Sequence, residues 1–138
     1  MALDTKLGRL DGQERVVVCH SLSCLLWFHA AAAIDESVRP DRLVLVSPPA
    51  SAQVPQSGAE FRIDQIDAAA VRSSVGGEIL IAASDADPYN PAGAQSTYGD
   101  ALGVRVCTVP GAAHITPDDG HGASPWIEEW CLQAKGEA

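Results

Sequence analysis

Short, unbroken runs of apolar residues are the feature that most constrains how this chain can fold. They do not alternate with polar residues, which is typical of strands buried on both faces of a sheet. Segments of helix-forming composition separate these runs along the chain. The expected strands are residues 15–19, 42–46, 78–83 and 104–109.

The segments between the strands complete the expected architecture. We expect helices at residues 3–10, 22–34, 64–73, 91–102 and 123–134. Strands that alternate with helices predict an α/β fold, with a parallel sheet of about four to five strands and helices on both faces. No internal repeat or second domain is visible, so residues 1–138 are expected to form a single domain.

Two of these segments carry more specific expectations. The helix at 22–34 is apolar nearly all round, so we expect it to be buried, with His29 packed or hydrogen-bonded in the core. Residues 50–65 are rich in Ser, Ala, Gln, Pro and Gly and are expected to form a long loop. The overlapping stretch from Pro48 to Ile63 is a candidate lid.

Charge and hydropathy exclude several classes of function. The net charge is −9, with 9 basic against 18 acidic residues, which disfavours nucleic acids and anionic membranes as partners. No apolar run approaches the roughly 20 residues that span a bilayer, and residues 1–15 lack the apolar stretch of a signal peptide. We therefore expect a cytoplasmic protein.

The four cysteines, Cys19, Cys24, Cys107 and Cys131, contain no Cys-x-x-Cys pair and have apolar neighbours. This pattern is typical of buried free thiols. No Cys or His residues have the spacing of a zinc site, so no metal site is expected.

A serine follows the first expected strand directly. Ser21 stands between strand and helix, where a tight turn would expose its hydroxyl above the sheet. The backbone N–H of Leu22 and the helix N-terminus would then favour a developing oxyanion. In the G-x-S-x-G pattern the glycine positions are Cys19 and Ser23 here, which are small but are not glycine. The alternative is that Ser21 is an ordinary helix N-cap.

An acid and a histidine follow the third and fourth expected strands. Asp85 and Asp87 lie directly after residues 78–83, and His114 follows residues 104–109. Taken alone, these are a turn and a structural histidine. Their order, Ser…Asp…His with each residue at the C-terminal end of a strand, is that of an α/β-hydrolase catalytic triad.

Five stretches carry a resemblance to a known family: VVVCHSLSCLL, LVLVSPP, ILIAASDADPYNP, VPGAAHIT and GHGASPW. Between about residues 16 and 126 the chain resembles the retinoblastoma-binding-protein-type serine hydrolases of the α/β-hydrolase fold. The resemblance implies Ser21 as nucleophile, Asp87 as acid and His114 as base. It favours Asp87 over Asp85 because the family's acid directly precedes a Pro-x-x-Pro element. His20 matches the family's His-Ser pair and is expected to support the turn.

The resemblance implies hydrolysis of a small ester or thioester through an acyl-enzyme, without a cofactor. Family members carry strands and an oxyanion loop before the nucleophile, and a nucleophile at position 21 leaves no room for them. We therefore expect an exposed sheet edge through which a homo-oligomer could form. The alternatives are a catalytically impaired, truncated hydrolase domain, acting as an interaction module or a non-functional remnant, and a flavodoxin-like binding domain. The last would need a phosphate loop, and no such motif is present.

Overall fold

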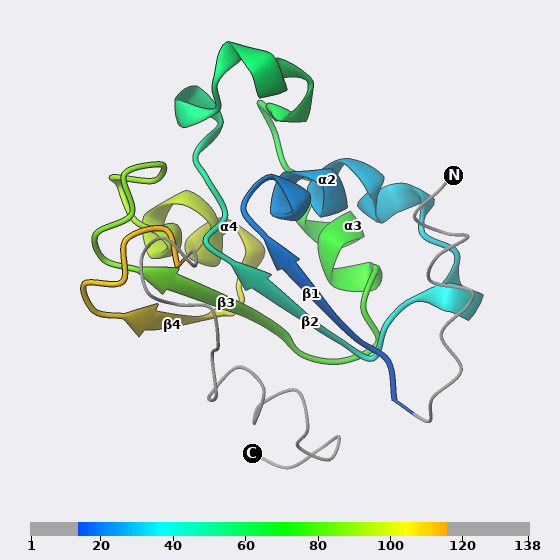
Figure 1. Cartoon of the computed structure of the whole chain (residues 1–138). Helices are drawn as coiled ribbons and strands as arrows, with labels where there is room; N and C mark the ends of the chain where they lie inside the picture. Colours follow the sequence, from blue (N-terminus) through cyan, green and yellow to red (C-terminus); the bar gives the residue numbers. More distant parts are fainter. Residues whose placement is uncertain (1–13, 116–138) are drawn as a thin grey trace.

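Four parallel strands form the sheet at the centre of the molecule (Figure 1). The structure is a computed structural model that describes residues 14–115. The strands are β1 (Val16–His20), β2 (Arg42–Val46), β3 (Ile79–Ser84) and β4 (Arg105–Val109), in the spatial order β1-β2-β3-β4. The expected α/β class is confirmed, and each expected strand agrees with the observed one to within one residue at either end.

Position in the sheet explains which strands are buried. Every residue of β2 and β3 is buried, because each of these strands has a neighbour on both sides. In β2, Leu43 and Leu45 point into the core under the helices, whereas Val44 and Val46 belong to a smaller cluster on the opposite face. β1 and β4 are the edges of the described sheet and are only partly buried.

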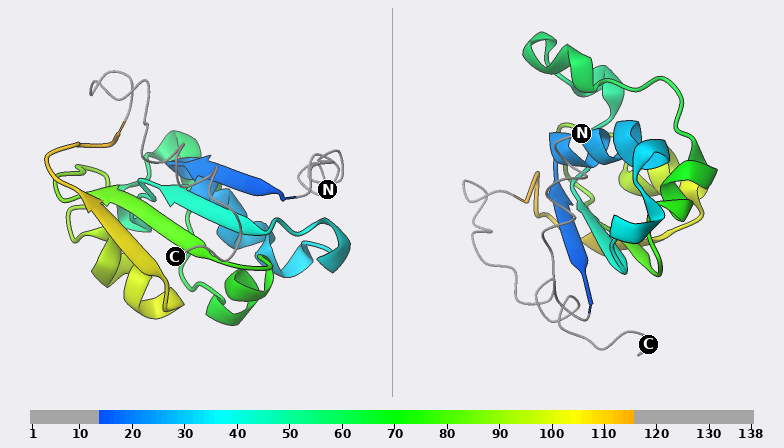
Figure 2. Two further views of the ribbon diagram at one scale, coloured as in Figure 1. Left: turned by 90° about the horizontal axis from the view of Figure 1, so that it is seen from below. Right: turned by 90° about the vertical axis from the view of Figure 1, so that its right-hand side faces the viewer.

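The helices of the described region cover one face of this sheet (Figure 2). They are α2 (Leu22–Ala30), α3 (Ala68–Ser73) and the short α4 (Asp100–Leu102). Trp27, Val71 and Leu102 bring the three helices into one core against the sheet. The helices expected at 3–10 and 123–134 lie outside the described residues.

The helix expected at 22–34 differs from the observed one. α2 ends at Ala30 and continues as a single 3-10 turn, Ala31–Ala33. The expectation that it is buried all round is wrong, because Leu26 is 41% exposed and His29 is exposed as well. α2 contacts the edge strand β1, so one side of the helix faces away from the sheet.

The helix expected at 91–102 begins later than its sequence suggests. A turn closed by Gly93 N–H donating to the Asn90 carbonyl (3.0 Å) comes first. A wide π-type turn, Gln95–Gly99, follows and leads into α4. A Cβ at Gly99 would lie 2.6 Å from the Val106 side chain, so only glycine allows this turn to lie so close to β4.

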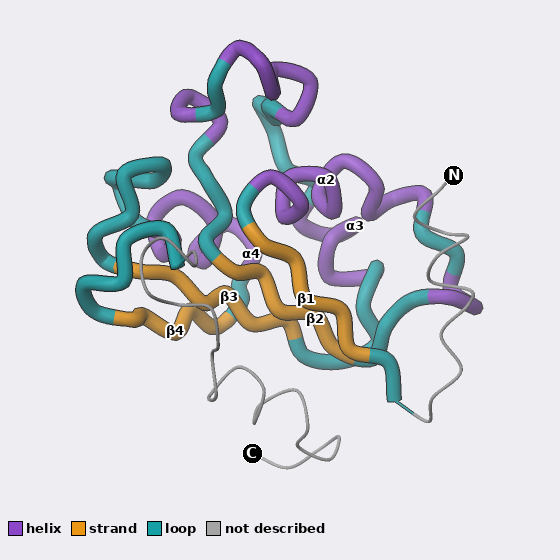
Figure 3. Tube along the Cα trace, viewed as in Figure 1, coloured by secondary structure: helices purple, strands orange, loops and turns teal. Residues whose placement is uncertain are grey.

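The expected loop after β2 contains two short 3-10 helices (Figure 3). They are Ser51–Gln53 and Gln56–Phe61, and we call residues 51–63 the cap segment. Its ends meet: the Ser51 hydroxyl donates to the Ile63 carbonyl and accepts from the Ile63 N–H, both at 2.8 Å. The cap segment rises beyond the carboxyl ends of β1 and β2 (Figure 1).

β1 is an edge strand of the described sheet and carries an exposed apolar side chain, Val18, which is 50% exposed. Self-association along this edge stays a prediction. None of the helices between residues 14 and 115 has both the length and the apolar character of a bilayer-spanning segment.

Tyr98 joins the π-type turn to the chain leaving β2. Its side chain is buried, and its hydroxyl donates a short hydrogen bond to the Pro49 carbonyl. Burial, together with the nearby Cys24, raises the pKa of Tyr98 to about 12. Nearby, the Asn90 amide donates to the Pro48 carbonyl at 3.3 Å. These contacts tie the chain after β2 to the chain after β3.

Replacing Tyr98 by phenylalanine removes the hydroxyl group that donates to the Pro49 carbonyl, so this buried carbonyl loses its hydrogen bond to Tyr98. We expect Tyr98→Phe to lower the free energy of unfolding by about 1–3 kcal/mol, measured by urea denaturation. Tyr89, which is 42% exposed, provides the matched control, and Tyr89→Phe should change stability by less than about 0.5 kcal/mol. Equal losses in both variants would contradict this role of the Tyr98 hydroxyl.

Candidate active site

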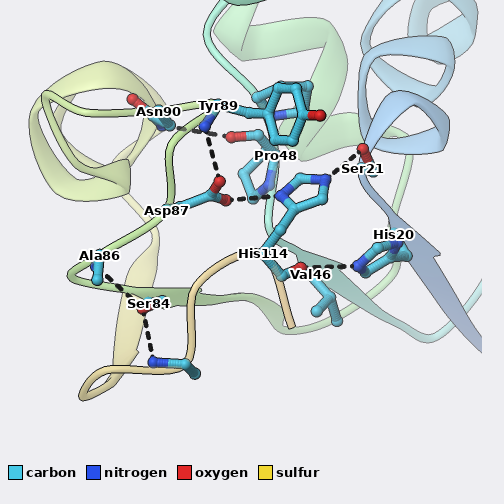
Figure 4. A network of polar contacts seen from close by, with 12 residues as sticks. His20, Ser21, Val46, Pro48, Ser84, Ala86, Asp87, Tyr89, Asn90 and His114 are labelled. Carbon is cyan, nitrogen blue, oxygen red and sulfur yellow. Dashed lines mark hydrogen bonds and ion pairs between the residues drawn. The ribbon is translucent and has the colours of Figure 1, made fainter. Parts of the chain in front are cut away.

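Ser21 occupies a strained turn between β1 and α2. Its backbone has φ 58° and ψ −123°, a region that residues with a side chain rarely adopt. The Ser21 N–H donates to the Val46 carbonyl at 2.9 Å, and the Ser21 carbonyl accepts from the Cys24 N–H at 2.9 Å. Its side chain does not cap α2, so Ser21 is not an ordinary N-cap serine. The hydroxyl instead points away from the helix, toward His114 (Figure 4).

Ser23 takes the place of the second glycine of the G-x-S-x-G pattern. Its hydroxyl accepts from the His20 N–H and donates to the His20 carbonyl, both at 2.7 Å. Ser23 is exposed, so its side chain meets no crowding from the sheet. The Ser23 side chain therefore stabilises the turn through two hydrogen bonds that a glycine at this position would not form.

Buried thiols surround the same turn. Burial raises the pKa of Cys19 to about 11, an effect partly offset by a hydrogen bond with Ser23, and it raises the pKa of Cys24 well above its usual value. The expectation of buried free thiols is confirmed for both, whereas Cys107 is half-buried. Cys131 lies outside the described residues. Because a thiol reacts as its thiolate, Cys19 and Cys24 are poor nucleophiles at neutral pH.

His114 lies in the loop after β4, which the loop after β3 holds in place. The Ser84 hydroxyl accepts from the Ala112 N–H (2.9 Å) and from the Ala86 N–H (3.0 Å). Asp85 accepts from the Gly111 N–H at 2.8 Å. These bonds, drawn in part in Figure 4, set the course of the backbone up to the histidine.

Asp87 is the acid that contacts the histidine. One carboxylate oxygen, Oδ2, lies 2.8 Å from His114 Nδ1, and the other accepts from the Tyr89 N–H at 2.9 Å. On the other side of the ring, His114 Nε2 lies 2.7 Å from Ser21 Oγ. The structure thus brings Ser21, His114 and Asp87 together (Figure 4). Asp85 instead bonds the histidine loop.

Two aromatic rings flank the histidine. His20 Nε2 lies 3.0 Å from the His114 carbonyl, where it can donate a hydrogen bond to the histidine loop. The Tyr89 ring packs against the His114 ring, with centroids 4.6 Å apart. Sequence reasoning gave Tyr89 no role, although its place in the Pro88–Pro91 element, two residues after the acid, was a signal.

A pocket of about 260 Å³ opens beside the serine. Its lining residues are Ser21, Leu22, Pro49, Val54, Pro55, Tyr89 and His114. Val54 and Pro55 come from the cap segment, whose sequence carries no motif that would have identified them. Between residues 14 and 115, no group of three or more His, Cys, Asp or Glu side chains is placed to hold a metal ion.

The arrangement can activate a hydroxyl group. A carboxylate that accepts from Nδ1–H leaves Nε2 of the ring free to accept the serine proton. Removing that proton turns a weak nucleophile into a strong one, at a site open to a pocket.

The strain at Ser21 predicts an unusual stability effect. Glycine adopts positive φ without strain, so Ser21→Gly should be more stable than Ser21→Ala by about 1 kcal/mol, after its own backbone entropy is counted. Both variants lose the bond to His114, so the comparison isolates the backbone. Thermal and urea unfolding of the two purified variants measure it, and an alanine variant as stable as the glycine variant would contradict the strained turn.

Comparisons with known proteins identify the family and the fold of the chain. The family model described as serine hydrolase matches residues 2–132. Among solved structures, the crystal structure of the ydeN gene product from B. subtilis superposes with a TM-score of 0.72 at 18% identity, over 84% of this chain. This chain spans 62% of that one, and the likeness shows the shared α/β fold. No curated protein gives a significant match. With the family model matching nearly its whole length, the chain belongs to the serine hydrolase family.

Proposed function

We propose that this protein hydrolyses small esters or thioesters through an acyl-enzyme formed on Ser21. The observation that carries the proposal is the continuous line of contacts from Ser21 Oγ through both ring nitrogens of His114 to Asp87, at 2.7 and 2.8 Å. The narrower sequence predictions, of a retinoblastoma-binding-protein-type hydrolase and of a cytoplasmic protein, stay predictions.

In the proposed reaction, His114 Nε2 takes the hydroxyl proton as Ser21 Oγ attacks the carbonyl carbon of the substrate. Asp87 holds the imidazole in the required tautomer and stabilises its cation. The tetrahedral intermediate then collapses, and the leaving alcohol or thiol takes the proton from His114. Water attacks the acyl-serine by the same proton path, which releases the acid and restores Ser21.

The negative charge of the intermediate needs hydrogen-bond donors. We assign the first of these to the backbone N–H of Leu22, which begins α2 and lines the pocket. The N-terminus of this nine-residue helix adds a favourable dipole at the same place. If the oxyanion site holds a single donor, turnover is lower by about 100- to 1000-fold.

Covalent labelling tests the proposal. We expect a fluorophosphonate probe to modify the purified protein, and the Ser21→Ala variant to remain unlabelled because the nucleophile is gone. Circular dichroism of both samples provides the control for folding. A folded but unlabelled protein would refute the proposal and favour the alternative of an impaired hydrolase domain used for interaction.

The two aspartates after β3 offer a matched pair of variants. Asp87→Asn removes the carboxylate that orients His114, and an aspartate-to-asparagine change in such a triad costs about 10⁴-fold in kcat. Asp85→Asn keeps an oxygen that can accept from the Gly111 N–H, so it should retain most of the activity. The test is to measure kcat for ester hydrolysis in both variants. Equal losses of activity would show that Asp87 is not the residue that orients His114.

A further inference from the structure

The pocket beside Ser21 is lined mainly by apolar groups. Leu22, Pro49, Val54 and Pro55 form most of its wall. No carboxylate, ammonium or guanidinium group is among its described lining residues. A charged substituent buried there would lose its hydration without gaining an ion-pair partner, which is costly. The net charge of −9 further disfavours anionic substrates. The pocket is therefore suited to an uncharged group.

The volume of the pocket limits the size of that group. A cavity of about 150 Å³ holds a benzene molecule, so scaling to this pocket gives room for roughly ten non-hydrogen atoms. Part of this room is taken by the ester group itself, which must lie against Ser21 Oγ. The remainder accommodates an apolar chain of roughly six carbons.

Val54, together with Pro55, forms the wall that the cap segment contributes, and the backbone of Val54 is held in place. The Arg62 guanidinium donates to the Val54 carbonyl at 2.6 and 3.2 Å. His29 Nε2 lies 3.1 Å from the carbonyls of Phe61 and Arg62, which ties the same segment to α2. The wall therefore has anchors both within the cap segment and on the helix that follows the serine.

The side chain of Val54 is also confined. A Cβ added at Gly58 would lie 3.4 Å from both the Val54 and the Leu22 side chains, so the backbone at Gly58 lies directly against both. Val54 is only 2% exposed. With backbone and side chain both held, Val54 cannot retreat to admit a longer chain.

From these contacts we infer that the pocket binds the acyl group of the substrate, that this group is short, uncharged and apolar, and that Val54 sets its maximum length. The inference rests on the proposed hydrolase function and names its substrate class. The assignment to the acyl group, as opposed to the alcohol part, belongs to the inference, and the pocket that Leu22 lines lies directly beside Ser21.

The test is the acyl-chain profile of hydrolysis. The substrates are p-nitrophenyl esters from acetyl to decanoyl, which share one leaving group, and kcat/KM is measured for each. Wild type should prefer acyl chains of up to roughly six carbons. Val54→Ala should move the optimum to longer chains, with a gain of about fourfold for each further methylene buried. Val54→Leu should move it to shorter chains.

Opposite shifts in the two variants separate pocket length from loss of folding, which would lower all rates together. Val18→Ala is the matched control: it makes the same change on the exposed edge of β1 and should leave the profile unaltered. An ester of equal length that ends in a carboxylate should react at least about tenfold more slowly, because the pocket offers no cation.

Two results would overturn the inference alone: an acyl-chain profile unchanged in both Val54 variants, or Val54 variants that alter the preference for the alcohol part instead. In either case Ser21 would still label with fluorophosphonate. Failure of the proposed function has a different signature, in which folded wild type neither labels nor cleaves any ester of the series, and the inference falls with it.

Discussion

The hydrogen bond from the Ser21 N–H to the Val46 carbonyl links the turn after β1 to the end of β2. A serine at φ 58° stores strain of about 1–3 kcal/mol, which the surrounding structure must offset. This bond, the bond from Cys24 back to Ser21 and the Ser23 hydroxyl together hold the turn in place. The outcome is a hydroxyl that faces His114 and not the start of its own helix.

The rest of the site depends on loops that hold one another. The loop after β3 binds the histidine loop through Ser84 and Asp85, and it supplies Asp87 to the histidine ring. The chain after β2 is bonded in turn to Asn90 and Tyr98. These loops all leave the carboxyl edge of a parallel sheet. A small displacement of one strand end would therefore change the distances between the residues of the site.

Local sequence carries some of this structure well. The strands were predictable because unbroken β-branched and leucine-rich runs need burial on both faces, and β2 and β3 have it. The burial of the helices was less predictable. Leu26 is exposed because α2 lies at the edge of the sheet, and no local sequence pattern shows which helix lies there. The positions of Ser21, His114 and an aspartate at 85 or 87 followed from order and strand ends, and the family resemblance favoured Asp87. Val54 and Tyr89 did not, because their place in the pocket depends on loops that meet only in three dimensions.

The two ends of the cap segment lie side by side, joined by the paired hydrogen bonds of Ser51 and Ile63. A segment whose ends meet can be exchanged for another of different length while the chain on either side keeps its course. In this architecture, the segment that contributes Val54 and Pro55 to the pocket is thus separable from the part that carries Ser21, Asp87 and His114. Substrate range could diverge among relatives by replacement of this one segment, with the reacting groups left untouched.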